Sequence, residues 1–271
     1  MIPQFLIGFV FGALIAILAW RVGALSRSGG WAAALTGGLI FGSGGLTWAA
    51  LLLTFFISSS VLSRLFTARK AEVNENFSKG SRRDWGQVFA NGGLGALLAV
   101  AYLFAVHQNW VWIAFVGAMA AVNADTWATE LGILNPTLPR LIINGKTVEK
   151  GTSGGISRLG TLSALAGAAL IGVVAALFSL PKGALGIILI ASLSGLIGSL
   201  FDSLLGATVQ AIYYCAVCQK ETERHPLHTC GTQTVRVRGW LWLNNDLVNF
   251  ACSLAGALSA AGLWLLLAGA H

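Results

Sequence analysis

The sequence predicts an all-α integral membrane protein, a single domain over residues 1–271 built from about eight transmembrane helices. Three observations predict this class. Hydrophobic residues make up 56% of the chain and charged residues only 10%, whereas a soluble domain carries about a quarter charged residues. The mean hydropathy is +0.75. Once the apolar segments are drawn, sixteen of the seventeen Lys and Arg residues fall in loops on one side.

The apolar segments have roughly the length that spans a bilayer. They lie near residues 2–24, 30–45, 46–63, 86–106, 110–131, 160–180, 184–213 and 247–269. The first lacks a basic start and a cleavage site of small residues, so it is interpreted as a retained helix and not as a signal peptide. The second and third form one stretch that is broken by Gly-Ser-Gly-Gly at 42–45. The alternative for that stretch is one helix with a re-entrant piece.

The distribution of basic residues predicts the topology, because cytoplasmic loops are enriched in Lys and Arg. With eight spans, the cytoplasmic loops hold Arg21, Arg27, Arg64, Arg69, Lys70, Lys79, Arg82, Arg83, Arg140, Lys146, Lys150, Arg158, Lys220, Arg224, Arg236 and Arg238. The opposite side holds only Lys182, and both termini lie outside the cytoplasm. Seven spans would reverse half of the loops and destroy this separation. The net charge of +7 therefore indicates topology and contact with anionic lipid, not nucleic acid.

Glycines recur at short spacing within the spans, as in Gly8/Gly12, Gly38/Gly42 and Gly195/Gly198. Small residues let helix backbones approach closely in lipid. We therefore expect close helix packing at these positions.

Acidic residues interrupt two of the spans. Asp125 lies at the cytoplasmic end of the fifth span, where Thr126 and Glu130 share one helical face, and Asp202 interrupts about 30 apolar residues of the seventh. Carboxylates at membrane depth usually face the protein interior or a wet cavity. Two of them from separate helices suit a Mg²⁺ ion that bridges phosphates. For the segment around Asp125, the alternative is a structural ion pair or a helix-end residue.

A glycine-rich loop precedes the sixth span. It comprises Lys150, Gly151, Thr152, Ser153, Gly154 and Gly155. Exposed backbone N–H groups, hydroxyl donors, a lysine and a following helix N-terminus are the features of a phosphate-binding loop. The order of residues differs from a Walker A motif. Alone, such a loop is more often a turn followed by a helix cap.

Polar residues also enter two further spans at their cytoplasmic ends. The segment from Lys70 to Asn91 contains Arg82, Arg83, Asp84, Gln87 and Asn91, of which the last three follow helical spacing. Its basic residues suit either a nucleotide phosphate or anchoring to anionic lipid. Before the last span, Asn245 and Asp246 are candidates for the same nucleotide site, and Asn244 is interpreted as a helix cap.

The polar loop over residues 214–240, between the seventh and eighth spans, carries Cys215, Cys218 and Cys230 together with His225 and His228. Three thiolates and one imidazole form a structural tetrahedral zinc site, and a filled site leaves no open position for catalysis. The sequence does not decide between the two histidines. Free thiols in a reducing compartment and redox chemistry are the alternatives.

Taken in order, segments 69–93, 123–132, 149–160, 198–208 and 239–249 resemble the integral-membrane family "domain of unknown function 92". That family includes a plant phytyl-phosphate kinase and the animal transmembrane protein 19. The resemblance covers nearly the whole chain. It implies transfer of a phosphate from a nucleoside triphosphate, typically CTP, to a prenyl phosphate. More distantly, the chain is similar to dolichol kinase, phytol kinase and CDP-diacylglycerol synthase, which use Mg²⁺ and CTP at an acidic cytoplasmic-side site.

Carried over by this resemblance, Asp125 and Asp202 match the family's metal-handling acids, and the Lys150–Gly155 loop matches its triphosphate loop. We therefore expect a phytyl- or polyprenyl-phosphate kinase of the cytoplasmic membrane, with Asp125, Asp202, Lys150 and Glu130 as its catalytic residues. The alternatives are a CTP-dependent cytidylyltransferase, a transporter with buried acids, and a non-catalytic assembly protein. The sequence leaves prenyl length, nucleotide and oligomeric state open.

Overall fold

A computed structural model describes residues 2–66, 82–105, 108–179 and 183–268, and it confirms the helical membrane bundle. Within these ranges, seven helices are long and apolar enough to cross a membrane. They are α1 (Ile2–Arg21), α2 (Arg27–Leu65), α3 (Trp85–Phe104), α4 (Asn109–Gly132), α5 (Arg158–Leu177), α6 (Ala184–Thr208) and α7 (Asn245–Ala268). Arg69, Lys70, Lys79 and Lys182 lie outside the described residues.

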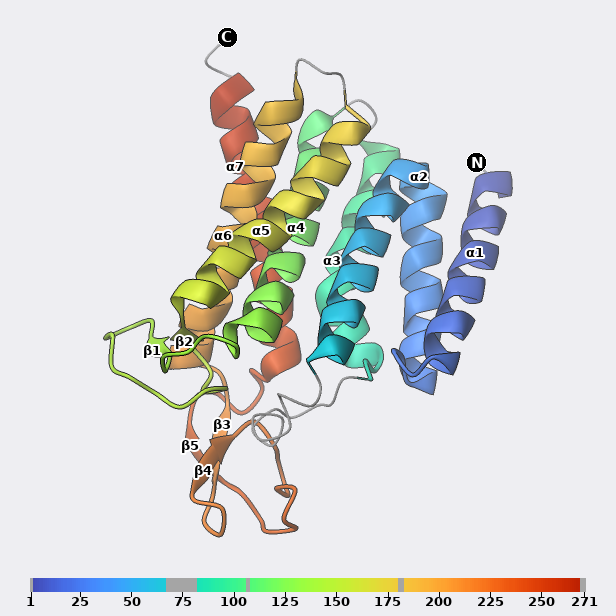
Figure 1. Ribbon diagram of the computed structural model, residues 1–271. Coiled ribbons are helices and arrows are strands. Elements are labelled where there is room, and N and C mark those ends of the chain that lie inside the picture. Colours follow the sequence, from blue (N-terminus) through green and yellow to red (C-terminus); the bar gives the residue numbers. More distant parts are fainter. Residues whose placement is uncertain (1, 67–81, 106–107, 180–182, 269–271) are drawn as a thin grey trace.

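Helix α2 folds back on itself at Gly45, whose positive φ of 74° breaks the helical backbone. A straight helix of 39 residues would be about 58 Å long. Instead, both of its ends meet Arg83: the backbone N–H of Ser26 donates to the Arg83 carbonyl, and Arg83 Nη1 donates to Ser60 Oγ. The two arms therefore run antiparallel, as the Gly-Ser-Gly-Gly break predicted and as an eight-pass topology requires (Figure 1).

The two termini lie at one end of the bundle, and the β elements lie at the other (Figure 1). The helix ends that carry Arg21, Arg27, Arg64 and Arg158 are at the β end. These basic residues therefore lie at one end of the bundle, as the sequence predicted. The assignment of this end to the cytoplasm stays a prediction.

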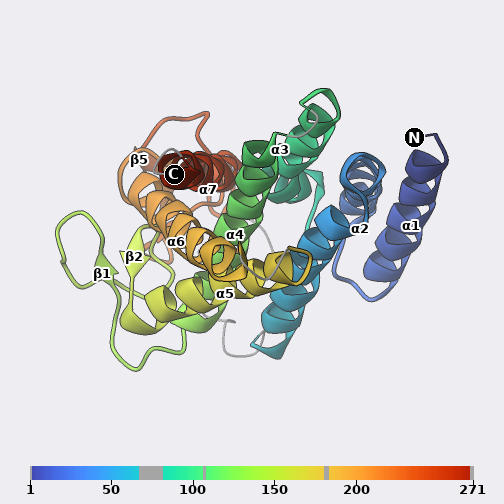
Figure 2. The ribbon, with the colours of Figure 1, turned by 90° about the horizontal axis from the view of Figure 1, so that it is seen from above.

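Helix α4 occupies the centre of the bundle and packs against α2, α3, α5, α6 and α7 (Figure 2). Fourteen of its 24 residues are buried, many of them alanine, because the helix is apolar on all sides. As the small-residue spacing predicted, α6 approaches it closely: a Cβ at Gly195 would lie 2.9 Å from the Ala120 carbonyl oxygen. Helix α1 lies at the rim, where Gly8 and Gly12 pack against the first arm of α2.

Two small antiparallel sheets lie at the basic end of the bundle. Strands β1 (Arg140–Leu141) and β2 (Gly155–Ile156) pair between α4 and α5. Strands β3 (Ile212–Cys215), β4 (Lys220–Thr222) and β5 (Val235–Arg238) form a sheet of order β4-β3-β5. The predicted span 184–213 is thus too long, because α6 stops at Thr208 and Ile212 begins a strand. The predicted polar loop is a folded element.

Candidate functional site

A polar cavity of about 290 Å³ opens at the basic end of the bundle. Thirteen of the site residues predicted from the sequence line it: Arg83, Gln87, Asn91, Asp125, Glu130, Lys150, Gly151, Thr152, Ser153, Gly154, Gly155, Asp202 and Asn245. Arg82 and Asp246 do not line it, although both were predicted to bind nucleotide. The structure thus brings together segments that are up to about 160 residues apart in the chain.

Asp125 and Asp202 face each other because their helices touch one turn away. A Cβ at Gly198 of α6 would lie 2.5 Å from the Cβ of Ala121 in α4. Each aspartate follows its contact residue by four positions, and residues at i and i+4 share a helix face. Both carboxylates therefore project from the same α4–α6 interface into the cavity.

The environment of these carboxylates is suited to a divalent cation. The Ser199 hydroxyl donates to Asp125 Oδ1 at 3.4 Å. Among the described residues, Asp202 Oδ2 is buried and has no hydrogen-bond partner. Asp202 also lies within electrostatic reach of both Asp125 and Glu223. Buried anionic oxygens on a cavity wall, with space for waters and phosphates, form the donor set that Mg²⁺ prefers.

The glycine-rich loop packs directly on the end of α6. Gly151 and Gly154 have φ values of +85° and +86°, and any side chain at Gly154 would collide with Ala207. The loop then enters β2 and reaches Ser157, whose hydroxyl caps α5 by accepting from the Gly160 N–H at 3.1 Å. The positive end of the α5 dipole is therefore directed at the cavity, next to the loop.

Replacement of Gly154 by alanine should destabilise this loop more than the same change at Gly145. Both glycines have positive φ, so alanine costs about 1–2 kcal/mol of backbone strain at either position. Only Gly154 is also packed against Ala207, which adds about 1–3 kcal/mol of overpacking. Gly145 has nothing within 4 Å. Thermal unfolding of the two variants in the same detergent measures the difference, and equal shifts would contradict the close approach at Gly154.

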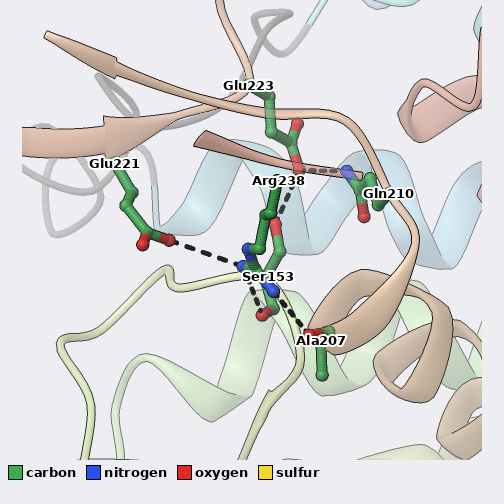
Figure 3. Close-up of polar contacts among 6 residues, drawn as sticks. All are labelled: Ser153, Ala207, Gln210, Glu221, Glu223 and Arg238. Atoms are coloured by element: carbon green, nitrogen blue, oxygen red, sulfur yellow. Dashed lines mark hydrogen bonds and ion pairs between the residues drawn. The ribbon is translucent and has the colours of Figure 1, made fainter. Parts of the chain in front are cut away.

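The β3–β5 sheet fastens the glycine-rich loop in place (Figure 3). The Ser153 hydroxyl donates to Glu223 Oε1 at 3.0 Å, and Gln210 Nε2 donates to the same oxygen at 2.9 Å. Arg238 donates from Nη1 to the Ala207 carbonyl at 2.6 Å and from Nη2 to the Ser153 carbonyl at 3.5 Å. These contacts join the sheet, the end of α6 and the loop into one wall of the cavity.

Sequence reasoning missed Glu223, Gln210 and Arg238. Glu223 stands in a charged run from Lys220 to Arg224 that has the composition of a solvated loop. Arg238 was assigned only a topological role, although it also pairs with Glu221 at 3.4 Å. No spacing in the sequence relates Glu223 to Ser153, because the two are 70 residues apart.

Lys150 lies in the cavity wall, but its ammonium group is bound to the backbone. Nζ donates to the carbonyls of Ile133 and Asn135, each at 2.8 Å. These carbonyls follow the C-terminus of α4, where a cation is favourable. The lysine therefore ties the loop to α4, and one of its three ammonium hydrogens remains beyond these two bonds.

Arg83 and Glu130 lie on the α2 side of the cavity. The two Nη atoms of Arg83 donate to Ser60 Oγ at 3.0 Å and Ser59 Oγ at 2.9 Å. Burial lowers the pKa of Arg83 to about 10, and the nearby charge of Glu130 opposes this shift, so the guanidinium stays charged at neutral pH. Glu130 accepts from the Ser63 hydroxyl at 2.6 Å.

The polar residues Asp84, Gln87 and Asn91 stabilise the start of α3, and the last two also line the cavity. Asp84 caps α3 and forms a capping box with Gln87. Asn91 Nδ2 donates to the Gln87 carbonyl at 2.9 Å. The sequence had left the basic residues of this segment open between binding a nucleotide phosphate and anchoring to anionic lipid. Before α7, the Asn244 side chain accepts from the Leu247 N–H at 3.1 Å, which confirms it as the cap.

The cysteine cluster includes His228 and not His225. One ligand atom from each of Cys215, Cys218, Cys230 and His228 lies within 4.8 Å of the others. His228 contributes Nδ1, which is 3.5 Å from Cys218 Sγ and 3.4 Å from Cys230 Sγ. His225 instead stacks on Tyr213 at 4.5 Å.

This arrangement fits structural zinc, since three sulfurs and one imidazole nitrogen converge as in a Cys₃His site. Hydrogen bonding with Thr232 lowers the pKa of Cys230 to about 6, whereas hydrogen bonding with Cys230 raises that of Cys218 to about 11.

A helical bundle of this length and apolarity, with its acids and loops gathered at one end, defines a multi-pass integral membrane protein. The chain belongs to the family "integral membrane protein DUF92", whose profile matches residues 10–257. Protein PGR of Arabidopsis thaliana is 34% identical over 276 residues, covering 93% of this chain and 94% of its own length.

Two further relatives are uncharacterized membrane proteins. That of Methanocaldococcus jannaschii is 37% identical over 163 residues, which is 60% of this chain and 65% of the relative. That of Synechocystis is 24% identical over 229 residues, 81% and 78% of the two chains. No solved structure matches the chain. The family predicted from the ordered motifs is confirmed, and the names of these relatives state no activity.

Proposed function

We propose that this protein is a membrane prenyl-phosphate kinase, which transfers the terminal phosphate of a nucleoside triphosphate, CTP being the first candidate, to a phytyl or polyprenyl monophosphate. The observation that carries the proposal is one cavity in which two facing aspartates lie opposite a glycine-rich loop at a helix N-terminus. Phosphoryl transfer depends mainly on positioning and on stabilising charge. These groups supply both.

The residues have distinct parts in this reaction. Asp125 and Asp202 would hold Mg²⁺, which when bound neutralises charge on the donor phosphates. Backbone N–H groups of the loop and the Thr152 hydroxyl bind those phosphates, with the loop held by Lys150, Arg238 and the Ser153–Glu223 hydrogen bond. An oxygen of the acceptor phosphate attacks the terminal phosphorus, the bond to the bridging oxygen breaks, and the nucleoside diphosphate leaves. Because the acceptor is already an anion, no strong general base is needed.

The depth of the aspartates favours an enzyme over a transporter. Asp125 precedes the end of α4 by seven residues and Asp202 precedes the end of α6 by six, about 10 Å and 9 Å of helix. The middle of a bilayer core lies about 15 Å from its edge. A transporter binds its substrate near that midplane. The cavity instead opens at the basic end, where soluble triphosphates are available if this end is cytoplasmic.

The test is a product assay with purified protein, CTP, Mg²⁺ and geranylgeranyl or phytyl monophosphate. We expect prenyl diphosphate and CDP in equal amounts. Release of pyrophosphate with a CDP-linked lipid would instead identify a cytidylyltransferase. Absence of any product, with CTP, ATP, GTP and UTP and with prenyl phosphates of several lengths, would contradict the proposal.

A further inference from the structure

A second, apolar cavity of about 390 Å³ lies between α1, α2 and α3. Aliphatic and aromatic side chains and glycines make up nearly all of its wall. The polar residues in its lining are Thr36, Arg83, Gln87 and Asn91. Thr36 donates its hydroxyl hydrogen to the Ala32 carbonyl at 2.7 Å, within its own helix. The remaining three polar residues follow each other at four-residue intervals up to and along α3, so they form one row.

The apolar cavity and the polar cavity meet at this row, since Arg83, Gln87 and Asn91 line both. The charged group of Arg83 lies between the Phe55 and Phe56 rings, 5.5 and 5.6 Å from their centroids, and both rings line the apolar cavity. The two cavities thus adjoin each other at the half-buried Arg83. This arrangement matches a lipid phosphate, in which an apolar chain is joined to an anionic group.

The shape of the apolar cavity follows from the bend in α2. Both arms of α2 line the cavity, and α1 and α3 contribute the rest of its wall. Its wall runs along the second arm from Phe56 beside Arg83 to Leu46 beside the Gly45 bend. Ten residues of helix span about 15 Å, so the cavity is long, with Arg83 at its basic end. It offers space for a single chain.

We propose that this cavity holds the hydrocarbon chain of a single-chain isoprenoid monophosphate, whose phosphate lies at Arg83, Gln87 and Asn91 where the two cavities meet. The inference rests on the proposed function and identifies where its acceptor binds. Removal of the chain from water is favourable along the whole apolar wall. The forked guanidinium of Arg83 has donors beyond the two used on Ser59 and Ser60, and it suits a phosphate. The phosphate then faces Asp125, Asp202 and the glycine-rich loop across the polar cavity.

Photolabelling of the full-length protein in nanodiscs tests this site. The probe is geranylgeranyl monophosphate with a diazirine at the end of its chain, used without nucleotide. We expect labelled peptides from α1 and from the bend of α2, around Phe41, Leu46 and Ala49. Unlabelled geranylgeranyl monophosphate should compete, whereas the same amount of phosphatidate, a two-chain phosphate, should not. Labelling confined to α5, α6 or α7, or equal competition by phosphatidate, would overturn the inference.

A chain-length series with variants gives a second test. Ala49→Phe, or the milder Ala49→Leu, fills the cavity near the bend and should weaken labelling by the geranylgeranyl probe about tenfold. Labelling by a farnesyl probe should persist, which shows that the variant is folded. Ala101→Phe, on the exposed face of α3, is the matched control and should label like the native protein. Loss of both probes together, or of neither, would contradict a chain that points towards the bend.

Labelling and transfer can fail separately. If the protein is labelled as expected but transfers no phosphate, the proposed site for the chain is supported and the proposed kinase activity is wrong. If the protein makes prenyl diphosphate but is labelled elsewhere, the proposed activity is supported and the proposed site for the chain is wrong.

Discussion

Replacement of Asp202 by asparagine should abolish most phosphate transfer while leaving the bundle folded. Asparagine has nearly the same shape, but it removes the anionic oxygen that is buried without a hydrogen-bond partner among the described residues. Loss of a group that stabilises charge in the transition state lowers rates by roughly 10²–10³. The measurement is the initial rate of prenyl diphosphate formation as a function of Mg²⁺ concentration, with thermal unfolding recorded in parallel.

The control for this variant is Asp84→Asn, which also removes one negative charge. Asp84 caps α3 outside the polar cavity, and asparagine is an equally good cap. We expect its rate and its Mg²⁺ dependence to resemble those of the native protein. If Asp202→Asn retained the native rate at limiting Mg²⁺, the two-aspartate metal site would be wrong, whatever the reaction.

Loss of one ligand from the proposed zinc site should loosen the glycine-rich loop, although the cysteine cluster does not line the polar cavity. His228→Ala removes one of four converging ligands, so we expect zinc content to fall from about one ion per chain to near zero. The β3–β5 sheet would then hold Glu223 and Arg238 less firmly, and through them Ser153. By analogy with outer-shell ligand changes, transfer should fall by about 10- to 100-fold. Hydrogen exchange of residues 149–157 should accelerate in the same variant.

His225→Ala is the matched variant for this prediction. His225 stacks on Tyr213 and contributes no ligand atom to the cluster, so zinc content should be retained. Metal analysis of the two purified variants decides between the histidines. Equal zinc content in both, or faster exchange of the loop in neither, would remove the proposed link between cluster and cavity.

The length and composition of the apolar segments predicted the helices well, because each transmembrane segment must satisfy its own backbone hydrogen bonds in lipid. Even the bend in α2 is visible as Gly-Ser-Gly-Gly. The end of α6 was missed because the apolar stretch continues to Ile212 and Tyr213, which pair as a strand. Apolarity does not distinguish a lipid-facing helix from a strand covered by its own sheet.

The candidate site was predictable to the extent that a single segment carries its own unusual chemistry. An acid within an apolar span and a glycine-rich loop before a helix are each conspicuous alone. Glu223 and Arg238 are charged residues in a polar loop, and only tertiary packing gives them their partners. For the same reason Lys150 was assigned to phosphate, since the sequence does not show that two carbonyls at the end of α4 bind its ammonium group.

The dependence of Ser153 on Glu223 also has a consequence for synthesis on the ribosome. Residues 149–157 are translated about 70 positions before their partners in the β3–β5 sheet. At about 5–20 residues per second, several seconds pass between synthesis of the loop and synthesis of the residues that fasten it. The glycine-rich loop is fixed in the wall of the cavity only after the β3–β5 sheet has folded. A truncated product that ends after α6 would therefore contain both aspartates and the loop but would lack the contacts that hold that loop in position.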